Sequence, residues 1–281
     1  MKEIASNIYV STVYPGVNVG FVVLPAGAIV VDVPVLPRDA RAWREQVLEI
    51  AEGPILYVML TDGHPDRLLN AGLMEAPIIA GRAAYRQAVD YTGGFWRSAI
   101  DVWARRYPEM ADELAAVSVV LPEILVDGRL TLHKGGEDVT VKCFAGAAPG
   151  STYLYFQERG VFFVGDTLVV ESHPFMDAEP DTRAWLNTLT WIRSKCSPET
   201  LIVPGRGPLC DQTGTRPLSK YIALVRRRAR ALIRGTRDDM TAIKNELLDY
   251  FPVPEDDFNS KLVKRRVRDG LNWVLDELKE D

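Results

Sequence analysis

Four loops rich in glycine, proline and aspartate each follow a short run of apolar, β-prone residues. The apolar runs have the length and composition of buried strands, and the turn residues after them mark where each strand ends. In many folds the functional residues lie on loops held by such a rigid scaffold. Functional residues are therefore expected first in these four loops, which are 61–67, 146–151, 165–167 and 204–208.

The remaining sequence predicts alternating β-rich and helical regions. The expected strands are 8–10, 18–24, 28–33, 55–60, 77–80, 123–126, 129–133, 139–144, 152–156, 161–164 and 200–203. The expected helices are 38–52, several pieces within 82–116, and then 182–196, 218–234, 240–250 and 261–280. A sheet-on-sheet core with helices outside accommodates this order. We expect one domain over 1–215 with a helical insertion at 82–116, and a C-terminal helical extension over 216–281 that packs on the same domain.

Charge and hydropathy argue against several classes of partner. The formal net charge of −5 gives no basic surface for nucleic acid. No apolar run approaches the ~20 residues that span a bilayer, and the first residues lack the apolar region of a signal peptide. These observations predict a cytoplasmic protein with no membrane partner. The three cysteines, Cys143, Cys196 and Cys210, have no metal-binding spacing and are expected to be small buried residues.

Taken together, the four loops resemble the motifs of the metallo-β-lactamase superfamily. That family carries Thr-His-x-His-x-Asp-His after one strand, Pro-Gly-His before Gly-Ser, Gly-Asp-Thr after another strand, and Pro-Gly-His-Gly near the end. The segments here read Thr-Asp-Gly-His-Pro-Asp-Arg from Thr61, Gly-Asp-Thr from Gly165, and Pro-Gly-Arg-Gly from Pro204. The resemblance, closest to glyoxalase II-like and SoxH-like hydrolases, implies an α+β fold: a four-layer αββα sandwich with the insertion and the helical tail added.

The resemblance also implies which side chains stand at the family's metal positions. In the family seven side chains hold two metal ions, usually zinc, which activate a water molecule for attack. The family's ligands retained here are His64, Asp66 and Asp166. Family histidines are replaced by Asp62, by Arg67, by Arg206, and by Ala147 or a neighbour of it. Because a guanidinium group stays protonated, it cannot bind a cation.

One hypothesis for these residues is a metal-free site. Asp62, Asp66 and Asp166 would repel one another unless a positive charge balanced them. Arg67 and Arg206 supply two fixed positive charges, so a salt-bridge network would replace the metals. This hypothesis predicts a protein that is non-catalytic or binds a small-molecule ligand, with Arg67, Arg206 and His173 as ligand-binding residues. A third hypothesis is a metal-free enzyme.

The alternative is a single altered metal site. Asp62, His64 and Asp166 would ligate one divalent ion such as Zn, Fe or Mn, with Asp66 or His173 as a fourth ligand. The protein would then be a hydrolase of an ester, thioester, lactone or phosphoester, with Asp66 and His173 as catalytic residues. His173 enters because a His-Pro pair after the Gly-Asp-Thr strand lies near the pocket entrance in similar branches of the family.

Two apolar regions lie outside these motifs. The aromatic residues of the insertion, Tyr91, Phe95, Trp96 and Trp103, would either pack the helices, which aromatic residues at helical spacing usually do, or form a hydrophobic mouth over the pocket. The apolar positions of the tail would pack on the core or on a second subunit. A homodimer is therefore a possible assembly.

Overall fold

The computed structural model describes residues 1–91, 93–176, 179–235 and 239–280. Within them the strands are β1 Lys2–Ala5, β2 Ile8–Ser11, β3 Val19–Leu24, β4 Gly27–Val31, β5 Ile55–Met59, β6 Ile78–Gly81, β7 Ile124–Val126, β8 Arg129–Lys134, β9 Glu137–Cys143, β10 Thr152–Phe156, β11 Val161–Val169 and β12 Leu201–Arg206. The α-helices are α1 Pro37–Ala51, α2 Pro65–Leu68, α3 Arg82–Asp90, α4 Gly93–Arg106, α5 Ala111–Ala115, α6 Thr182–Lys195, α7 Thr215–Ile233, α8 Met240–Leu248 and α9 Asp257–Glu280.

The strands form two sheets. Strands β1 to β7 make a seven-stranded sheet in sequence order, and a five-stranded sheet has the order β12-β11-β10-β9-β8. The first four strands pair antiparallel, whereas β4 to β7 pair parallel. Parallel neighbours need a crossover connection, and α1 supplies it between β4 and β5. In the second sheet β11 and β12 are parallel, with α6 between them in the sequence.

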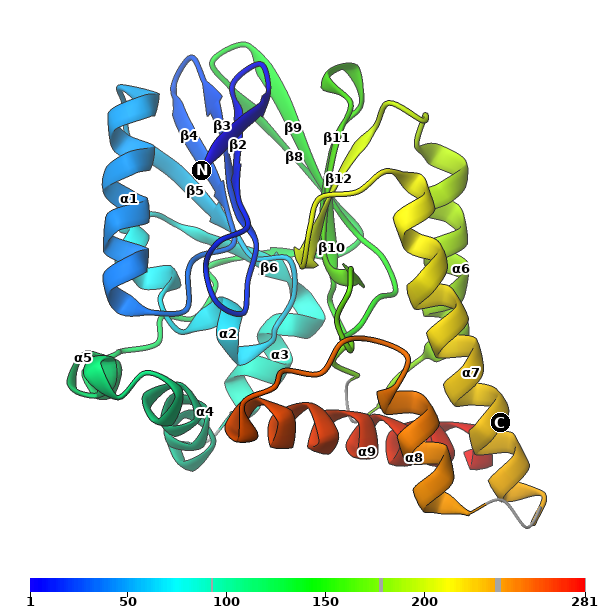
Figure 1. The fold of residues 1–281 in the computed structure, drawn as a ribbon. Helices are drawn as coiled ribbons and strands as arrows, with labels where there is room; N and C mark the ends of the chain where they lie inside the picture. Colours follow the sequence, from blue (N-terminus) through cyan, green and yellow to red (C-terminus); the bar gives the residue numbers. More distant parts are fainter. Residues whose placement is uncertain (92, 177–178, 236–238, 281) are drawn as a thin grey trace.

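The two sheets pack face to face around apolar residues from both. Val22, Ile29 and Met59 of the first sheet share this central core with Phe163 and Val203 of the second. Alternate residues of each strand face outward, because successive side chains of a strand point to opposite faces. The layers therefore need a helix on each outer side, which Figure 1 shows.

Helices cover both outer faces. Trp43 and Val47 of α1 pack on the first sheet, and Trp185 of α6 and Ile222 of α7 pack on the second. Helix, sheet, sheet and helix thus follow one another across the molecule (Figure 1). The structure confirms the predicted α+β fold with its αββα layers.

The C-terminal helices are joined to the second half of the core by a buried polar contact. Arg226 Nη1 of α7 lies 2.8 Å from Glu277 Oε1 of α9, and that carboxylate accepts a 3.0 Å bond from the backbone amide of Thr182 at the start of α6. Helix α9 then crosses the end of the sandwich near α4 and α8 (Figure 1). In the described part of the chain, no helix combines the length and apolarity needed to cross a membrane.

Candidate functional site

The loop after β5 is fixed by its own polar side chains. Asp32, which follows β4, accepts bonds of 2.9 and 2.7 Å from the Thr61 amide and hydroxyl. Asp62 Oδ1 accepts a 2.9 Å bond from the His64 amide. His64 caps the short helix α2, and its Nδ1 accepts a 3.3 Å bond from the Asp66 amide. These local bonds hold Asp62, His64 and Asp66 at the end of the parallel strands.

Arg67 lies at the centre of the carboxylates. Its side chain is 0% exposed, and its Nη2 donates a 2.5 Å bond to Asp166 Oδ1. Its Nε lies 3.7 Å from Asp32 Oδ2 and 3.8 Å from Asp62 Oδ2. One fully buried guanidinium group therefore faces three carboxylates, two that follow β4 and β5 and one within β11.

Arg206 contacts the same carboxylates from the other side. Its Nε lies 3.0 Å from Asp166 Oδ2, and its Nη2 lies 3.3 Å from Asp66 Oδ2. Asn18 holds the 204–208 loop in place by donating 2.9 and 2.8 Å bonds to the carbonyls of Pro204 and Gly207. At Gly205 a Cβ atom would lie 2.1 Å from Asp166 Oδ1, so the loop can come this close only with glycine at that position.

We call Asp32, Asp62, Asp66, Asp166, Arg67 and Arg206 the ion-pair cluster. Burial alone would raise the pKa of Asp166, but Arg206 and Arg67 outweigh it and hold that pKa at about 2. Burial also opposes ionisation of Asp66, yet His64 and Arg206 leave its pKa below the usual range. Asp66 and Asp166 are thus the two carboxylates that the two arginines neutralise.

The carboxyl groups of Asp32 and Asp62 are less well balanced by positive charge. Burial raises the pKa of both Asp32 and Asp62 above the ordinary value, despite the opposing charge of Arg67. Asp62 Oδ2 is buried and accepts no hydrogen bond from the described residues. Burial also lowers the pKa of His64, against the opposing effect of Asp66. The cluster therefore contains fewer positive charges than carboxyl groups, and burial favours a proton on Asp32 and Asp62.

Replacing Asp62 with asparagine should be nearly neutral. The raised pKa means that the folded state holds the Asp62 proton more tightly than the unfolded chain, so this group lowers stability as pH rises through its folded pKa. Asp62→Asn removes that loss. Urea unfolding should give the variant a free energy of unfolding within about 1 kcal/mol of wild type. Relative to wild type, the variant should become more stable between pH 4 and pH 7. A large loss at pH 7 would contradict this charge assignment.

Trp103 of α4 covers the cluster. Its indole Nε1 donates a 2.7 Å bond to Asp66 Oδ1, and the side chain is buried. Its ring also fills the space beside Gly16, where a Cβ atom would lie 2.6 Å away. Packing was the expected role of the insertion aromatics, and Trp103 packs, but it also holds a site carboxylate. Phe95, by contrast, is 39% exposed.

Trp103→Phe should separate these two roles, since it keeps an aromatic ring and removes the indole donor. Hydrogen bonds to charged groups contribute about 1.5–3 kcal/mol, so we expect a loss of about that size in urea unfolding. Trp96→Phe is the matched control in the same helix and should cost less. Equal losses in the two variants would show that the bond to Asp66 contributes nothing.

His173 lies apart from the cluster contacts. Its side chain is 1% exposed, its Nε2 lies 3.2 Å from the Leu248 carbonyl oxygen, and its ring packs on Tyr221 and Phe251. The structure therefore places the imidazole against α7 and the 248–251 segment. His173 therefore does not lie with the retained family ligands, because its ring packs among these aromatic neighbours instead.

Phe175, two residues later, does reach the site. Its ring centroid lies 4.4 Å from that of His64, and the guanidinium carbons of Arg206 and Arg266 lie 4.5 and 3.5 Å from it. Phe175, Asp32 and Arg266 were not among the site residues predicted from the sequence. Asp32 carried the same signal as the other site residues, a carboxylate directly after an apolar strand.

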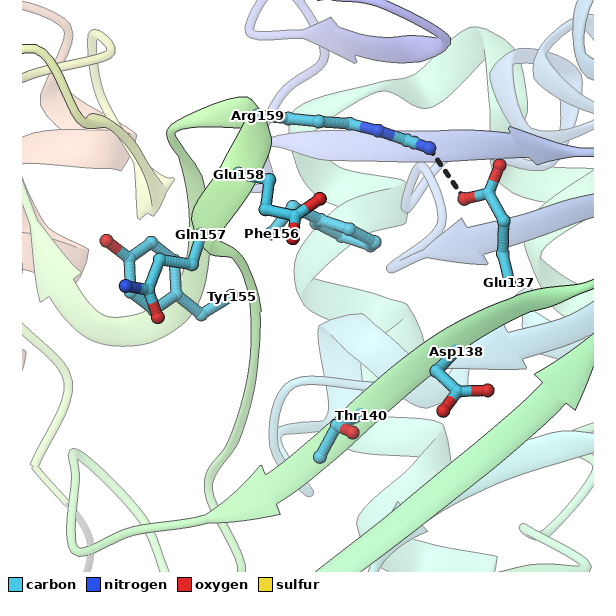
Figure 2. A pocket seen from close by; sticks show the side chains of 8 residues that line it. All are labelled: Glu137, Asp138, Thr140, Tyr155, Phe156, Gln157, Glu158 and Arg159. Carbon is cyan, nitrogen blue, oxygen red and sulfur yellow. Dashed lines mark hydrogen bonds and ion pairs between the residues drawn. The ribbon is translucent and has the colours of Figure 1, made fainter.

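Two cavities need to be distinguished. One of about 350 Å³ is lined by Arg206, the 12–18 loop and α9. Another of about 450 Å³ lies at the turn ends of β9 and β10, where Arg159 Nη2 pairs with Glu137 at 2.6 Å (Figure 2). The second cavity includes no residue of the four loops. The candidate site is therefore the ion-pair cluster with the cavity beside Arg206.

Comparison with known proteins agrees with this architecture. The sequence model of the metallo-beta-lactamase superfamily matches residues 14–215. A metallo-beta-lactamase family protein from Thermus thermophilus is 18% identical with a TM-score of 0.63, over 96% of this chain and 94% of that one. A beta-lactamase domain protein from Burkholderia ambifaria is 17% identical with a TM-score of 0.69, over 98% and 88%.

A stereoselective inverting sec-alkylsulfatase from Pseudomonas sp. has the same fold at 13% identity and a TM-score of 0.69, over 97% of this chain but 49% of its own. At these identities the solved structures establish a shared fold. The family match covers more than half of the sequence and includes all four loops. The chain belongs to the metallo-beta-lactamase superfamily.

Proposed function

We propose that this protein is a metal-independent, ligand-binding member of its superfamily, in which two guanidinium groups take the place of the metal cations. The observation that carries the proposal is the position of Asp166. Its Oδ1 accepts a bond from Arg67 and its Oδ2 pairs with Arg206. Both oxygens of this carboxylate, which stands at a position of a family metal ligand, are thereby occupied by fixed cations.

The residues present do not fit a pair of metal ions. A metal ligand must offer a free lone pair to the ion, whereas Arg67 and Arg206 bring protonated donors to the same oxygens. His64 Nδ1 is directed at the Asp66 amide, 3.3 Å away. Within the described ranges, no group of three or more His, Cys, Asp or Glu side chains is arranged to hold a metal ion.

The single-metal alternative meets the same obstacle. It needs Asp62, His64 and Asp166 to converge on one ion, yet the buried guanidinium of Arg67 lies 2.5 Å from Asp166 and 3.8 Å from Asp62. A divalent ion next to that charge would be strongly repelled in a buried site. No observation among the described residues favours this alternative, so binding without hydrolysis is the function we propose.

Hydrolysis assays test this proposal. The purified protein should show no turnover of a thioester, a lactone and a phosphoester above the buffer rate, with or without added Zn²⁺, Mn²⁺ or Fe²⁺. A saturable rate that requires one of these ions and disappears in Asp166→Asn, under conditions where that variant is folded, would overturn the proposal. A saturable rate without metal would instead support a metal-free enzyme.

A further inference from the structure

The lining of the cavity beside the ion-pair cluster contains more arginines than carboxylates. Arg106 of α4, Arg206 of the 204–208 loop and Arg266 of α9 all line it. Among the described lining residues, Glu171 is the one carboxylate, and its side chain is exposed. A cleft lined by one sign of charge raises the local concentration of ligands of the opposite sign.

Of the three arginines in this lining, Arg206 pairs with carboxylates, whereas Arg266 and Arg106 have no carboxylate partner among the described residues. Arg266 Nη1 donates a 3.0 Å bond to the His173 carbonyl, while its Nε is buried without a hydrogen-bond partner in the described part of the chain. Burial and then Arg206 lower the pKa of Arg266 to about 9.

Phe175 provides the remaining local compensation. The negative face of an aromatic ring attracts a cation, and the guanidinium carbons of Arg266 and Arg206 lie 3.5 and 4.5 Å from its ring centroid. This contact holds two like charges close together beside one cavity. Arg206 commits Nε and Nη2 to carboxylates and leaves its Nη1 outside those two ion pairs.

Part of the remaining lining is apolar. Val17 from the 12–18 loop and Leu262 and Val263 from α9 line the same cavity. Its volume of about 350 Å³ is at the small end of the range of small-molecule sites. A ligand that fills it would place a polar end at the arginines and an apolar part on these side chains.

We propose that this cavity binds a small organic anion, with its anionic oxygens at Arg206, Arg266 and Arg106 and its hydrocarbon part against Val17, Leu262 and Val263. The proposal rests on the proposed ligand-binding function and names the class of ligand. Arg266 belongs to α9, outside the residues that match the family. The site is therefore built partly by the C-terminal helices of this chain.

Calorimetric titration with three probes tests the proposal. Hexanoate has both the anionic group and the apolar chain, hexanamide lacks the charge, and acetate lacks the chain. We expect hexanoate to bind at least about tenfold more tightly than either of the others, because a hydrogen bond to a charged group is worth about one factor of ten or more in affinity. Added salt should weaken hexanoate binding.

Four variants locate the site. Arg266→Gln and Arg106→Gln should each weaken hexanoate binding by about tenfold. Arg265→Gln and Arg105→Gln are the controls, since both are exposed neighbours of these residues outside the cavity lining, and they should bind as wild type does. Thermal unfolding of each variant checks its fold. If Arg266→Gln is unfolded, the comparison of Arg106→Gln with Arg105→Gln tests whether the cavity arginines bind hexanoate.

Equal binding of hexanoate and hexanamide, no hexanoate binding, or equal effects of the cavity and control variants would overturn the inference. These failures are distinguishable from failure of the proposed function. A metal-free protein without hydrolytic activity that does not bind hexanoate overturns only the ligand class. Stoichiometric metal in the purified protein overturns the proposed function itself.

Discussion

Asp166→Asn should destabilise the protein by about 3–5 kcal/mol, the cost of breaking a buried ion pair by removing one partner. The substitution keeps the shape of the side chain but removes the charge that both Arg67 and Arg206 contact, at 2.5 and 3.0 Å. Two guanidinium groups would then share the remaining carboxylates. Urea unfolding at pH 7 measures the loss.

Asp127→Asn is the matched control for this variant. Asp127 also pairs with an arginine, Arg82, at 3.0 Å, but its side chain is 76% exposed. Exposed pairs contribute about 0–1 kcal/mol, so this variant should remain close to wild type. If Asp166→Asn costs no more than Asp127→Asn, the ion-pair cluster does not hold the loops together.

Arg67→Met should give a loss of similar size, about 3–5 kcal/mol at pH 7, with a distinctive pH dependence. Methionine fills much of the buried volume but leaves Asp32, Asp62 and Asp166 without their nearest cation. Burial already raises the pKa of Asp32 and Asp62, and without Arg67 these two pKa values should rise further. The low pKa of Asp166 should rise toward its ordinary value.

The sign of the pH effect follows from those shifts. A folded-state pKa above the unfolded value makes the folded state bind more protons, so the variant loses stability as pH rises from about 4 upward. Wild-type Asp166 behaves oppositely, because its pKa of about 2 gives stability that is present above the unfolded value and lost in acid. The difference in free energy of unfolding between wild type and Arg67→Met, which we call the gap, should therefore be widest at pH 7 and smaller toward pH 5.

Urea unfolding of both proteins between pH 5 and pH 7 measures this gap. Arg82→Met is the control, since Arg82 is 45% exposed in its pair with Asp127, and its effect should be small at every pH. A gap between wild type and Arg67→Met that stays constant with pH would show that the buried carboxylates do not depend on Arg67 for their charge.

Much of the fold was predictable because the loops carry local information. Glycine or proline after a run of apolar residues indicates where a strand ends. The loops 61–67, 165–167 and 204–208 could therefore be identified from the sequence alone. The resemblance then supplied their arrangement. The structure confirms the αββα sandwich through the pairing of β11 with β12 and the helices on both faces.

The site was predictable where the motif itself contained the residue. Asp66, Asp166, Arg67 and Arg206 lie within the loops, and the structure brings these four side chains together. Trp103 was expected to pack, and its bond to Asp66 joins residues 37 positions apart. No local pattern encodes such a contact, because it depends on where α4 packs.

Arg266 shows the same limit more clearly. It lies in a helix whose many charged residues look like a solvated face, and its exposed neighbour Arg265 has the same side chain. Only the packing of α9 across the end of the sandwich places Arg266, and not Arg265, beside Phe175. His173 illustrates the converse, since a motif suggested a pocket residue and the packing of Tyr221 and Phe251 surrounds it.

The exchange of metal charge for guanidinium charge is tested most directly by the metal content of the protein. Protein purified without chelator, from medium supplemented with zinc, iron and manganese, would be measured by elemental mass spectrometry. We predict far less than one equivalent of any of these metals per chain, and an unfolding temperature unchanged by EDTA. One or two equivalents of a metal that EDTA removes, with a lower unfolding temperature afterwards, would contradict the account.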